Sequence, residues 1–176
     1  GAASVAGALR PDNIAASAAP AVVPKSAVAP DVVETYLRGV SELSKASAEG
    51  LGTALRCFRE ITLREPGFAP GLAGHAACLF ILGWLGHAPG REVYPAARHL
   101  ALQAVALDER GSVARHALAT INWLLEADVA ACDSEFRRAL ELSPSDADGH
   151  TLYALFLSGT GRYSESIAEA QYALKL

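Results

Sequence analysis

The chain has 176 residues, of which 51% are hydrophobic and 19% are charged, and its formal net charge is -4. This composition excludes an intrinsically disordered protein, and the acidic balance argues against nucleic-acid binding, which needs clustered Lys and Arg. No apolar run is long enough to cross a membrane. Because the chain begins with Gly1 and contains no Met, we expect it to be part of a longer protein or a processed product.

Residues 1–30 differ in composition from the rest of the chain. Eleven of them are Ala and four are Pro, and only Arg10, Asp12 and Lys25 are charged. Proline interrupts helices, and no periodic apolar face appears. We therefore predict an irregular linker that is semi-extended around its prolines. A signal peptide is the alternative, but a basic start and a compact Leu-rich core are missing.

Helical periodicity begins at Asp31 and predicts a repeat domain over residues 31–176. The first unit covers residues 31–66. It has two apolar stripes separated by a Ser/Ala/Gly-rich break, and Pro66 ends it. The stripes consist of Val33, Tyr36, Leu37 and Val40, then of Leu51, Ala54, Leu55, Phe58 and Ile61.

The second unit, residues 67–109, has a helix from Ala69 and another from about Glu92 to Leu107. It holds about nine residues more than the later units. The extra residues coincide with the Gly/Pro-rich stretch 84–91, so we predict a projecting loop there, anchored by Trp84 and Tyr94.

The third and fourth units cover residues 110–144 and 145–176, and they repeat with a period of 34. The period aligns His116 with His150, Ala139 with Ala173, and Leu142 with Leu176. A fixed period of this size indicates stacked helical repeats that share one elongated core. Asp128 is a candidate N-cap for one helix, and Ser145 with Asp148 is a candidate capping box for the next.

The second helices carry small, aromatic and small residues in a fixed order. In the third unit these are Cys132, Phe136 and Ala139, followed by Pro144. The fourth unit contributes Gly161, Tyr163, Glu165, Ile167, Ala170 and Ala173. These residues resemble tetratricopeptide (TPR) repeats, although His116 and His150 replace Trp and Thr120 replaces Gly. The resemblance implies an all-α, right-handed superhelical solenoid of about four antiparallel helix pairs.

A narrower resemblance rests on the segments 36–39 (Tyr-Leu-Arg-Gly) and 135–142, together with the long break in the second unit. They are similar to the C-terminal TPR region of bacterial winged-helix transcriptional regulators and some adenylate cyclases. This implies a regulatory, protein-binding module in the cytoplasm, or a periplasmic domain of a membrane-anchored regulator. A standalone TPR chaperone for secreted partners and a small-molecule-sensing domain remain as alternatives.

The sequence contains none of the common catalytic, phosphate-binding or metal-binding motifs, so we predict no enzymatic activity, cofactor or metal. Four histidines fall in helical patterns: His75, His99, His116 and His150. We expect the last two to pack between helices. The three cysteines, Cys57, Cys78 and Cys132, fit no zinc or disulfide framework. They are expected to be small buried residues.

The candidate partner-binding groove lies on the first helices of three units, where the sequence is apolar and nearly uncharged. TPR-like repeats line their concave wall with first helices. At a spacing of i, i+4 and i+7, the predicted groove residues are Ala73, Ala77, Phe80, Ala117, Ile121, Leu124, Thr151, Leu155 and Ser158. Such a groove fits an apolar helix or an extended segment of a protein partner. The unprotected end at Leu176 also suggests a homodimer.

Overall fold

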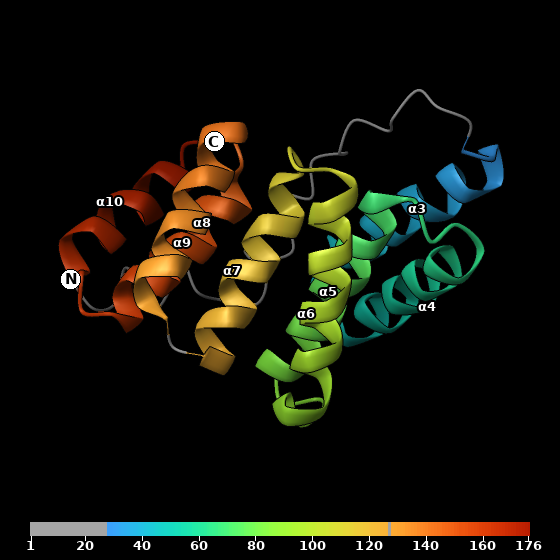
Figure 1. Ribbon diagram of the computed structural model, residues 1–176, viewed down its shortest axis with the longest axis horizontal. Helices are drawn as coiled ribbons and strands as arrows, with labels where there is room; N and C mark the ends of the chain where they lie inside the picture. Colours follow the sequence, from blue (N-terminus) through green and yellow to red (C-terminus); the bar gives the residue numbers. More distant parts are fainter. Residues whose placement is uncertain (1–27, 127) are drawn as a thin grey trace.

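A computed structural model describes residues 28–126 and 128–176, and within these ranges all regular structure is helical (Figure 1). The helices are α3 (Pro30–Leu43), α4 (Ala48–Arg64), α5 (Ala69–Trp84), α6 (Gly90–Leu107), α7 (Ser112–Glu126), α8 (Val129–Leu142), α9 (Ala147–Gly159) and α10 (Tyr163–Ala173). Consecutive helices form antiparallel pairs, which confirms the predicted all-α class. Of the predicted linker, residues 1–30, the first 27 lie outside the described residues.

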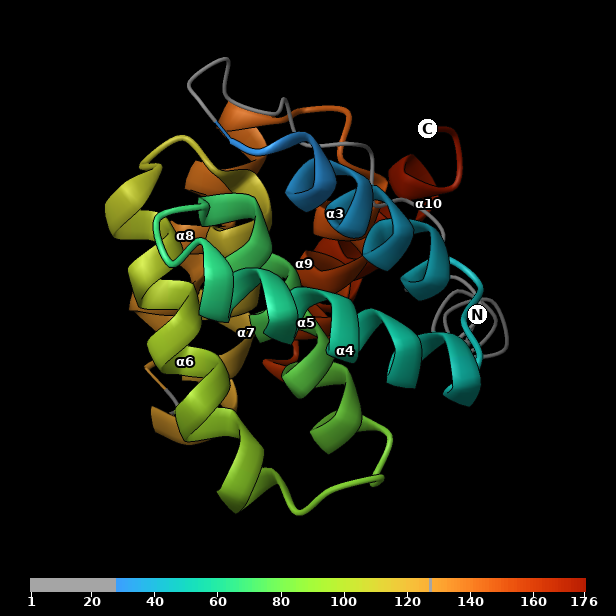
Figure 2. The same cartoon turned by 90° about the vertical axis from the view of Figure 1, so that its right-hand side faces the viewer.

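The pairs follow one another along the long axis of the molecule, from α3 and α4 at one end to α9 and α10 at the other (Figures 1 and 2). Each inner helix contacts both its own partner and the neighbouring pair. Helix α7 contacts α8 within its pair, and also α5, α6 and α9. The apolar stripes of the repeats therefore meet in one continuous core, as expected of stacked units.

Side-chain caps fix where several helices begin. Ser47 and Asp128 accept hydrogen bonds from the backbone N–H groups of Gly50 and Ala131, at 3.0 and 3.1 Å. The Asp128 cap is as predicted. The predicted role of Ser145 is wrong, because α9 starts one residue later and Asp146 accepts from Gly149 N at 3.0 Å. Each cap satisfies an N–H that has no partner within its helix.

The insertion in the second unit is divided between a helix and the connection. Compared with the third unit, α6 has 18 residues against 14 in α8, which is about one extra turn, whereas α5 has 16 against 15 in α7. The connection between α5 and α6 is confined to residues 85–89. The α5–α6 tip therefore extends past its neighbours (Figure 1). The predicted loop over 84–91 is corrected at its ends, since Trp84, Gly90 and Arg91 are helical.

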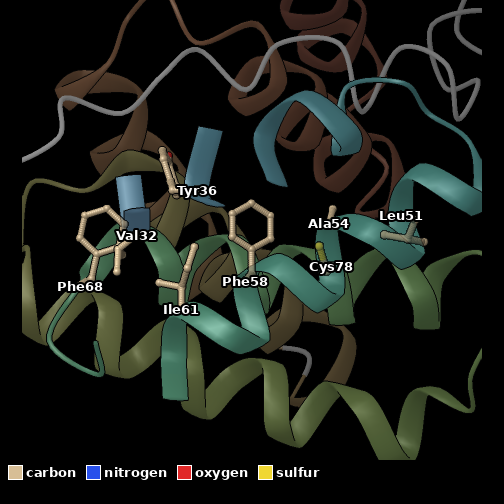
Figure 3. Packing of buried hydrophobic residues seen from close by; sticks show 8 residues of the cluster. All are labelled: Val32, Tyr36, Leu51, Ala54, Phe58, Ile61, Phe68 and Cys78. Carbon is tan, nitrogen blue, oxygen red and sulfur yellow. The ribbon is translucent and has the colours of Figure 1, made fainter. Parts of the chain in front are cut away.

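The first unit packs onto α5 through a cluster of aromatic and aliphatic side chains (Figure 3). The ring of Tyr36 meets Phe58 and Phe68 edge-on, with centroids 6.0 and 5.5 Å apart. A Cβ at Gly74 of α5 would lie 2.5 Å from the Phe58 ring. Glycine thus lets α5 approach Phe58 closely, which joins the first unit to the second. The remaining buried members of the cluster are Val32, Leu51, Ala54, Ile61 and Cys78.

Phe136 is the centre of the cluster that joins the third and fourth units. It is fully buried, as predicted, and its ring lies 5.4 Å from Tyr153 and 5.2 Å from Phe156 between centroids. Because α9 supplies both neighbouring rings, α8 and α9 share one core. The second-helix residues Cys132 and Ala139 are buried beside it.

Candidate partner-binding surface

The structure divides the nine predicted groove residues into buried and half-exposed groups. Four are buried: Ala73, Phe80, Ala117 and Ile121. The other five are half-exposed: Ala77, Leu124, Thr151, Leu155 and Ser158. The prediction that all nine face an open groove is wrong for the first group. Phe80 is 5% exposed and Ile121 is 0% exposed, so neither side chain is available to a partner.

The small residues explain the difference. Ala73, Ala77 and Ala117 are among the predicted groove residues. Instead, α5 and α7 pack directly on each other, because small side chains allow close helix approach. Phe80, Ala117 and Ile121 then fill the same core cluster. Helices α5 and α7 are therefore rotated relative to the predicted face, whereas the three predicted residues on α9 are all partly exposed.

The five half-exposed residues form what we call the first-helix surface: Ala77, Leu124, Thr151, Leu155 and Ser158. They lie on α5, α7 and α9, which contact one another in that order. Leu124 packs on the cluster that contains Phe80. The Thr151 hydroxyl donates to its own helix, at the carbonyl of Ala147, 2.8 Å away, so this surface offers mainly apolar contacts.

Charge is segregated away from this surface. Helix α5 contains no Asp, Glu, Lys or Arg, and in α9 the only such residue is Asp148. Helix α7 has two, Arg115 and Glu126, which pair with Glu135 of α8 and Arg98 of α6. The second helix α8, by contrast, carries five charged side chains among its 14 residues. A charged partner segment would therefore find few charged side chains to pair with on α5 and α9, whereas an apolar segment would gain by leaving water there.

An aromatic ladder at the α5–α6 tip adjoins the first-helix surface. The Phe80 ring stacks on Trp84 and Tyr94, with centroids 6.0 and 6.4 Å apart. Trp84 and the following Leu85 are both exposed. Sequence reasoning treated Trp84 as a loop anchor. The spacing of four from Phe80 was the signal that both lie on one helix face.

The two period-related histidines hold unit junctions together. His116 is buried, stacks on Phe136, and its Nδ1 lies 3.2 Å from Asp146 Oδ2. Burial alone would raise the pKa of Asp146, but the hydrogen bond and charge of His116 outweigh it and lower that pKa. His150 Nε2 donates to the carbonyl of Pro144 at 3.0 Å, and its Nδ1 lies 2.6 Å from Glu169 Oε2. Both imidazoles thus serve packing.

A charged network links the third and fourth units. Asp133 accepts hydrogen bonds from Tyr153 Oη at 2.8 Å, from Arg137 Nε at 2.8 Å, and from Arg162. Arg162 also donates hydrogen bonds to Glu165 from Nε and Nη2, at 2.8 and 2.6 Å. Burial, together with the hydrogen bond to Asp133, raises the pKa of Tyr153 to about 12. These donors and acceptors are mutually satisfied, which indicates a structural junction.

The cysteines and the remaining histidines of the described residues form no metal-binding cluster. Cys57, Cys78 and Cys132 are buried free thiols, and burial raises the pKa of Cys78 to about 12. Across residues 28–126 and 128–176, no three His, Cys, Asp or Glu side chains gather as a metal site. None of the described helices is long and apolar enough to cross a membrane.

Comparison with solved structures identifies similar folds at low sequence identity. TTC0263, a thermophilic TPR protein of Thermus thermophilus, is 16% identical, and the match covers 83% of this chain and 74% of that chain with a TM-score of 0.66. A crystal structure of MamA is 17% identical over 78% of this chain and 72% of that chain, with a TM-score of 0.52. The MamA RS-1 ArsTM double mutant is 16% identical over 85% and 76%, with a TM-score of 0.54.

The fold is therefore TPR-like. No protein-family model matches the sequence, and no curated protein matches it. The sequence resemblance to TPR repeats and the structural likeness agree on the helical architecture.

Proposed function

We propose that the chain is a non-catalytic protein-binding module whose first-helix surface takes an apolar helix or extended segment of a partner. The supporting observation is the uncharged, half-exposed surface shared by α5, α7 and α9. TPR-like stacking arranges first helices side by side, and an amphipathic segment can bind across them through residues at i, i+3/i+4 and i+7.

The test uses peptides selected by display on the folded chain, with affinity measured by fluorescence anisotropy. We expect selection of peptides with an apolar stripe at helical spacing. The variant Leu124→Glu/Leu155→Glu should weaken binding by about tenfold or more, because each carboxylate would lose water on binding. Leu63→Glu is the matched control, since Leu63 is an exposed leucine on α4, outside this surface. If the parent chain, the double variant and Leu63→Glu bound these peptides with equal affinity, the proposed role of the first-helix surface would be refuted.

The finer part of the proposal is that this module belongs to a bacterial transcription regulator. Its support is the segment 36–39 and the helix over 135–142, which resemble the TPR region of winged-helix regulators. We propose a cytoplasmic location, which suits three free thiols. The full coding sequence tests this: a DNA-binding head before Gly1 supports it, and a different head or none overturns it.

A further inference from the structure

The imidazole of His150 on α9 lies between two oxygen atoms that belong to different segments of the chain. Its Nε2 is 3.0 Å from the carbonyl oxygen of Pro144, in the turn between α8 and α9. Its Nδ1 is 2.6 Å from Oε2 of Glu169, on α10. The residue is 8% exposed, so water has little access to replace either contact.

The two contacts together require a proton on each ring nitrogen. A backbone carbonyl and a carboxylate can only accept hydrogen bonds, whereas a neutral imidazole has one N–H and one bare nitrogen. A neutral His150 would therefore place a nitrogen lone pair against an oxygen lone pair, at either Pro144 or Glu169. Because an imidazole binds a proton more tightly than an ordinary carboxylate does, the additional proton belongs on the ring. The pair is then an imidazolium with a carboxylate.

The histidine one period earlier has no such second acceptor. His116 Nδ1 lies 3.2 Å from Asp146 Oδ2, but its buried Nε2 has no hydrogen-bond partner within the part of the chain that the structure describes. A single ring proton is enough for these contacts. The requirement for two ring protons is therefore specific to His150 and does not follow from the repeat pattern.

The contacts of His150 hold the second half of α10. The first half is fixed by Ser166, which is buried and donates its hydroxyl to the carbonyl of Ala154 at 2.7 Å. Further along the helix, Glu169 accepts from His150, and the ring of Tyr172 lies edge-on to the imidazole with centroids 4.7 Å apart. His150 thus connects the end of α10 to the turn between α8 and α9.

The ionisable groups around His150 favour a charged ring. Helix α9 packs against α7, α8 and α10. Glu169 approaches from α10, and Asp146, which faces His116 of α7, is close enough to feel the charge of His150. On α8, Asp133 is paired with Arg137 and Arg162. Burial disfavours a charge on the imidazole, whereas the nearby carboxylates and the two hydrogen bonds favour it.

We propose that His150 and Glu169 form a proton-dependent clasp that fastens the end of α10 to the turn between α8 and α9. The folded clasp retains a proton that a histidine in an unfolded chain releases at about pH 6.5. Above that pH the folded state therefore binds more protons than the unfolded state, so the stability contributed by the clasp decreases as the pH rises. The contribution is fully present in mildly acidic solution and is lost once the folded clasp deprotonates.

NMR of the ring nitrogens measures the proton count directly. At about pH 7 we expect both nitrogens of His150 to carry protons in the parent chain. Glu169→Gln should reduce the count to one, because the glutamine amide can donate to Nδ1 while Nε2 still donates to Pro144. A single ring proton on His150 in the parent chain at this pH would overturn the proposal.

Urea denaturation at about pH 5.5, 7 and 8.5 tests the effect on stability. The ratio of the unfolding equilibrium constants, parent over Glu169→Gln, should rise about tenfold over this range, as for a hydrogen bond to a charged and partly solvated group. His99→Gln is the matched control, since His99 is an exposed histidine on α6, and it should keep the pH dependence of the parent. A ratio that stays constant over the range would contradict the clasp.

Hydrogen exchange locates the effect within the chain. In the parent, protection of the α10 amides should fall relative to that of α4 as the pH rises, whereas in Glu169→Gln the two should keep their ratio. Equal loss of protection in α10 and α4 would show that the proton acts on the whole stack and not on the end of α10. These measurements use no peptide ligand, so their outcome is independent of the proposed partner binding.

Discussion

The α-carbon of Gly149 lies directly against the imidazole of His116, where a Cβ would be 2.2 Å from Cε1 and 2.7 Å from Nε2. Gly149 is near the start of α9 and His116 is on α7. The ring has little freedom to move, because it stacks on Phe136 and its Nδ1 faces Asp146. The absence of a Cβ at position 149 therefore allows the successive first helices α7 and α9 to pack this closely.

We predict that Gly149→Ala destabilises the protein. Overpacking typically costs about 1–3 kcal/mol, which exceeds the roughly 0.5–1 kcal/mol that alanine gains over glycine within a helix. Urea denaturation should show the loss. Gly52→Ala is the control, since only Arg56 Nη1 lies nearby, at 3.9 Å, and we expect it to stabilise the protein. If both alanine variants are more stable than the parent chain, the His116 ring can move aside, and this contact does not set the spacing between α7 and α9.

Phe136→Ala should lower the free energy of unfolding by about 3–5 kcal/mol, the usual cost of truncating a buried phenylalanine. Because repeat units couple to their neighbours, the loss should begin at the junction of α8 with α9. Hydrogen exchange should accelerate in α7–α10 before α3 and α4. Leu63→Ala serves as an exposed control. Uniform acceleration along the chain would show that the units unfold as one body.

The repeat architecture was predictable because burial of an apolar stripe leaves a regular trace. The period of 34 in the third and fourth units predicted their helix pairs, and the buried second-helix residues Cys132, Phe136 and Ala139 followed from it. Helix α8 combines apolar and charged residues at helical spacing, so its pattern indicates which side faces inward. Helix α10 does not follow this rule, because Tyr163 and Ile167 are exposed and Ser166 is buried.

The rotation of the first helices was not predictable in the same way. Helix α5 has no charged residue to mark its outer side, so periodicity leaves the orientation of Phe80 undetermined. On α7, Ile121 is buried while Leu124 is half-exposed, and no difference in residue type separates them. The predicted loop over 84–91 was too long for another reason. Pro89 and Gly90 suggested a loop, yet proline is well tolerated where a helix starts.

The Asp133 network should make stability depend on pH. Burial alone would raise the pKa of Asp133, but hydrogen bonds from Arg137, Arg162 and Tyr153 outweigh it, and the pKa is lowered below its usual value of 3.8. A lowered carboxyl pKa in the folded state contributes stability above the unfolded-state pKa, and this contribution is lost as pH falls through the folded-state pKa.

Asp133→Asn should therefore destabilise the protein at pH 7 by about 1–2 kcal/mol, toward the low end for hydrogen bonds to a charged group that is partly solvated. The difference from the parent chain should shrink as the pH falls from the unfolded-state pKa of about 4 through the lower folded-state pKa of Asp133. Denaturant titrations at pH 7 and at a pH below about 4 measure this difference in the free energy of unfolding. Glu141→Gln, which removes an exposed i,i+3 pair with Arg138, is the matched control. A pH-independent difference would assign the effect of Asp133 to packing.

Two glycines end first helices in the same way and should respond alike to substitution. Gly86 follows α5 with φ 73°, and Gly161 follows α9 with φ 83°. At each site the next residue donates back into the last turn, His87 N to Leu82 O and Arg162 N to Leu157 O, both at 2.9 Å. This is the Schellman arrangement, which needs a left-handed residue at that position.

Gly86→Ala and Gly161→Ala should each cost about 1–2 kcal/mol, because an L residue is strained in the left-handed region. Asparagine should cost less at both sites, since it tolerates that region. Gly67→Ala is the control, because no neighbour lies within 4 Å of its added Cβ and its φ is not in that region. Thermal unfolding of the five variants measures the order. If Gly86→Ala were neutral while Gly161→Ala destabilised, the α5–α6 tip would be relaxing independently of the stack, and Trp84 would then have no fixed position beside the first-helix surface.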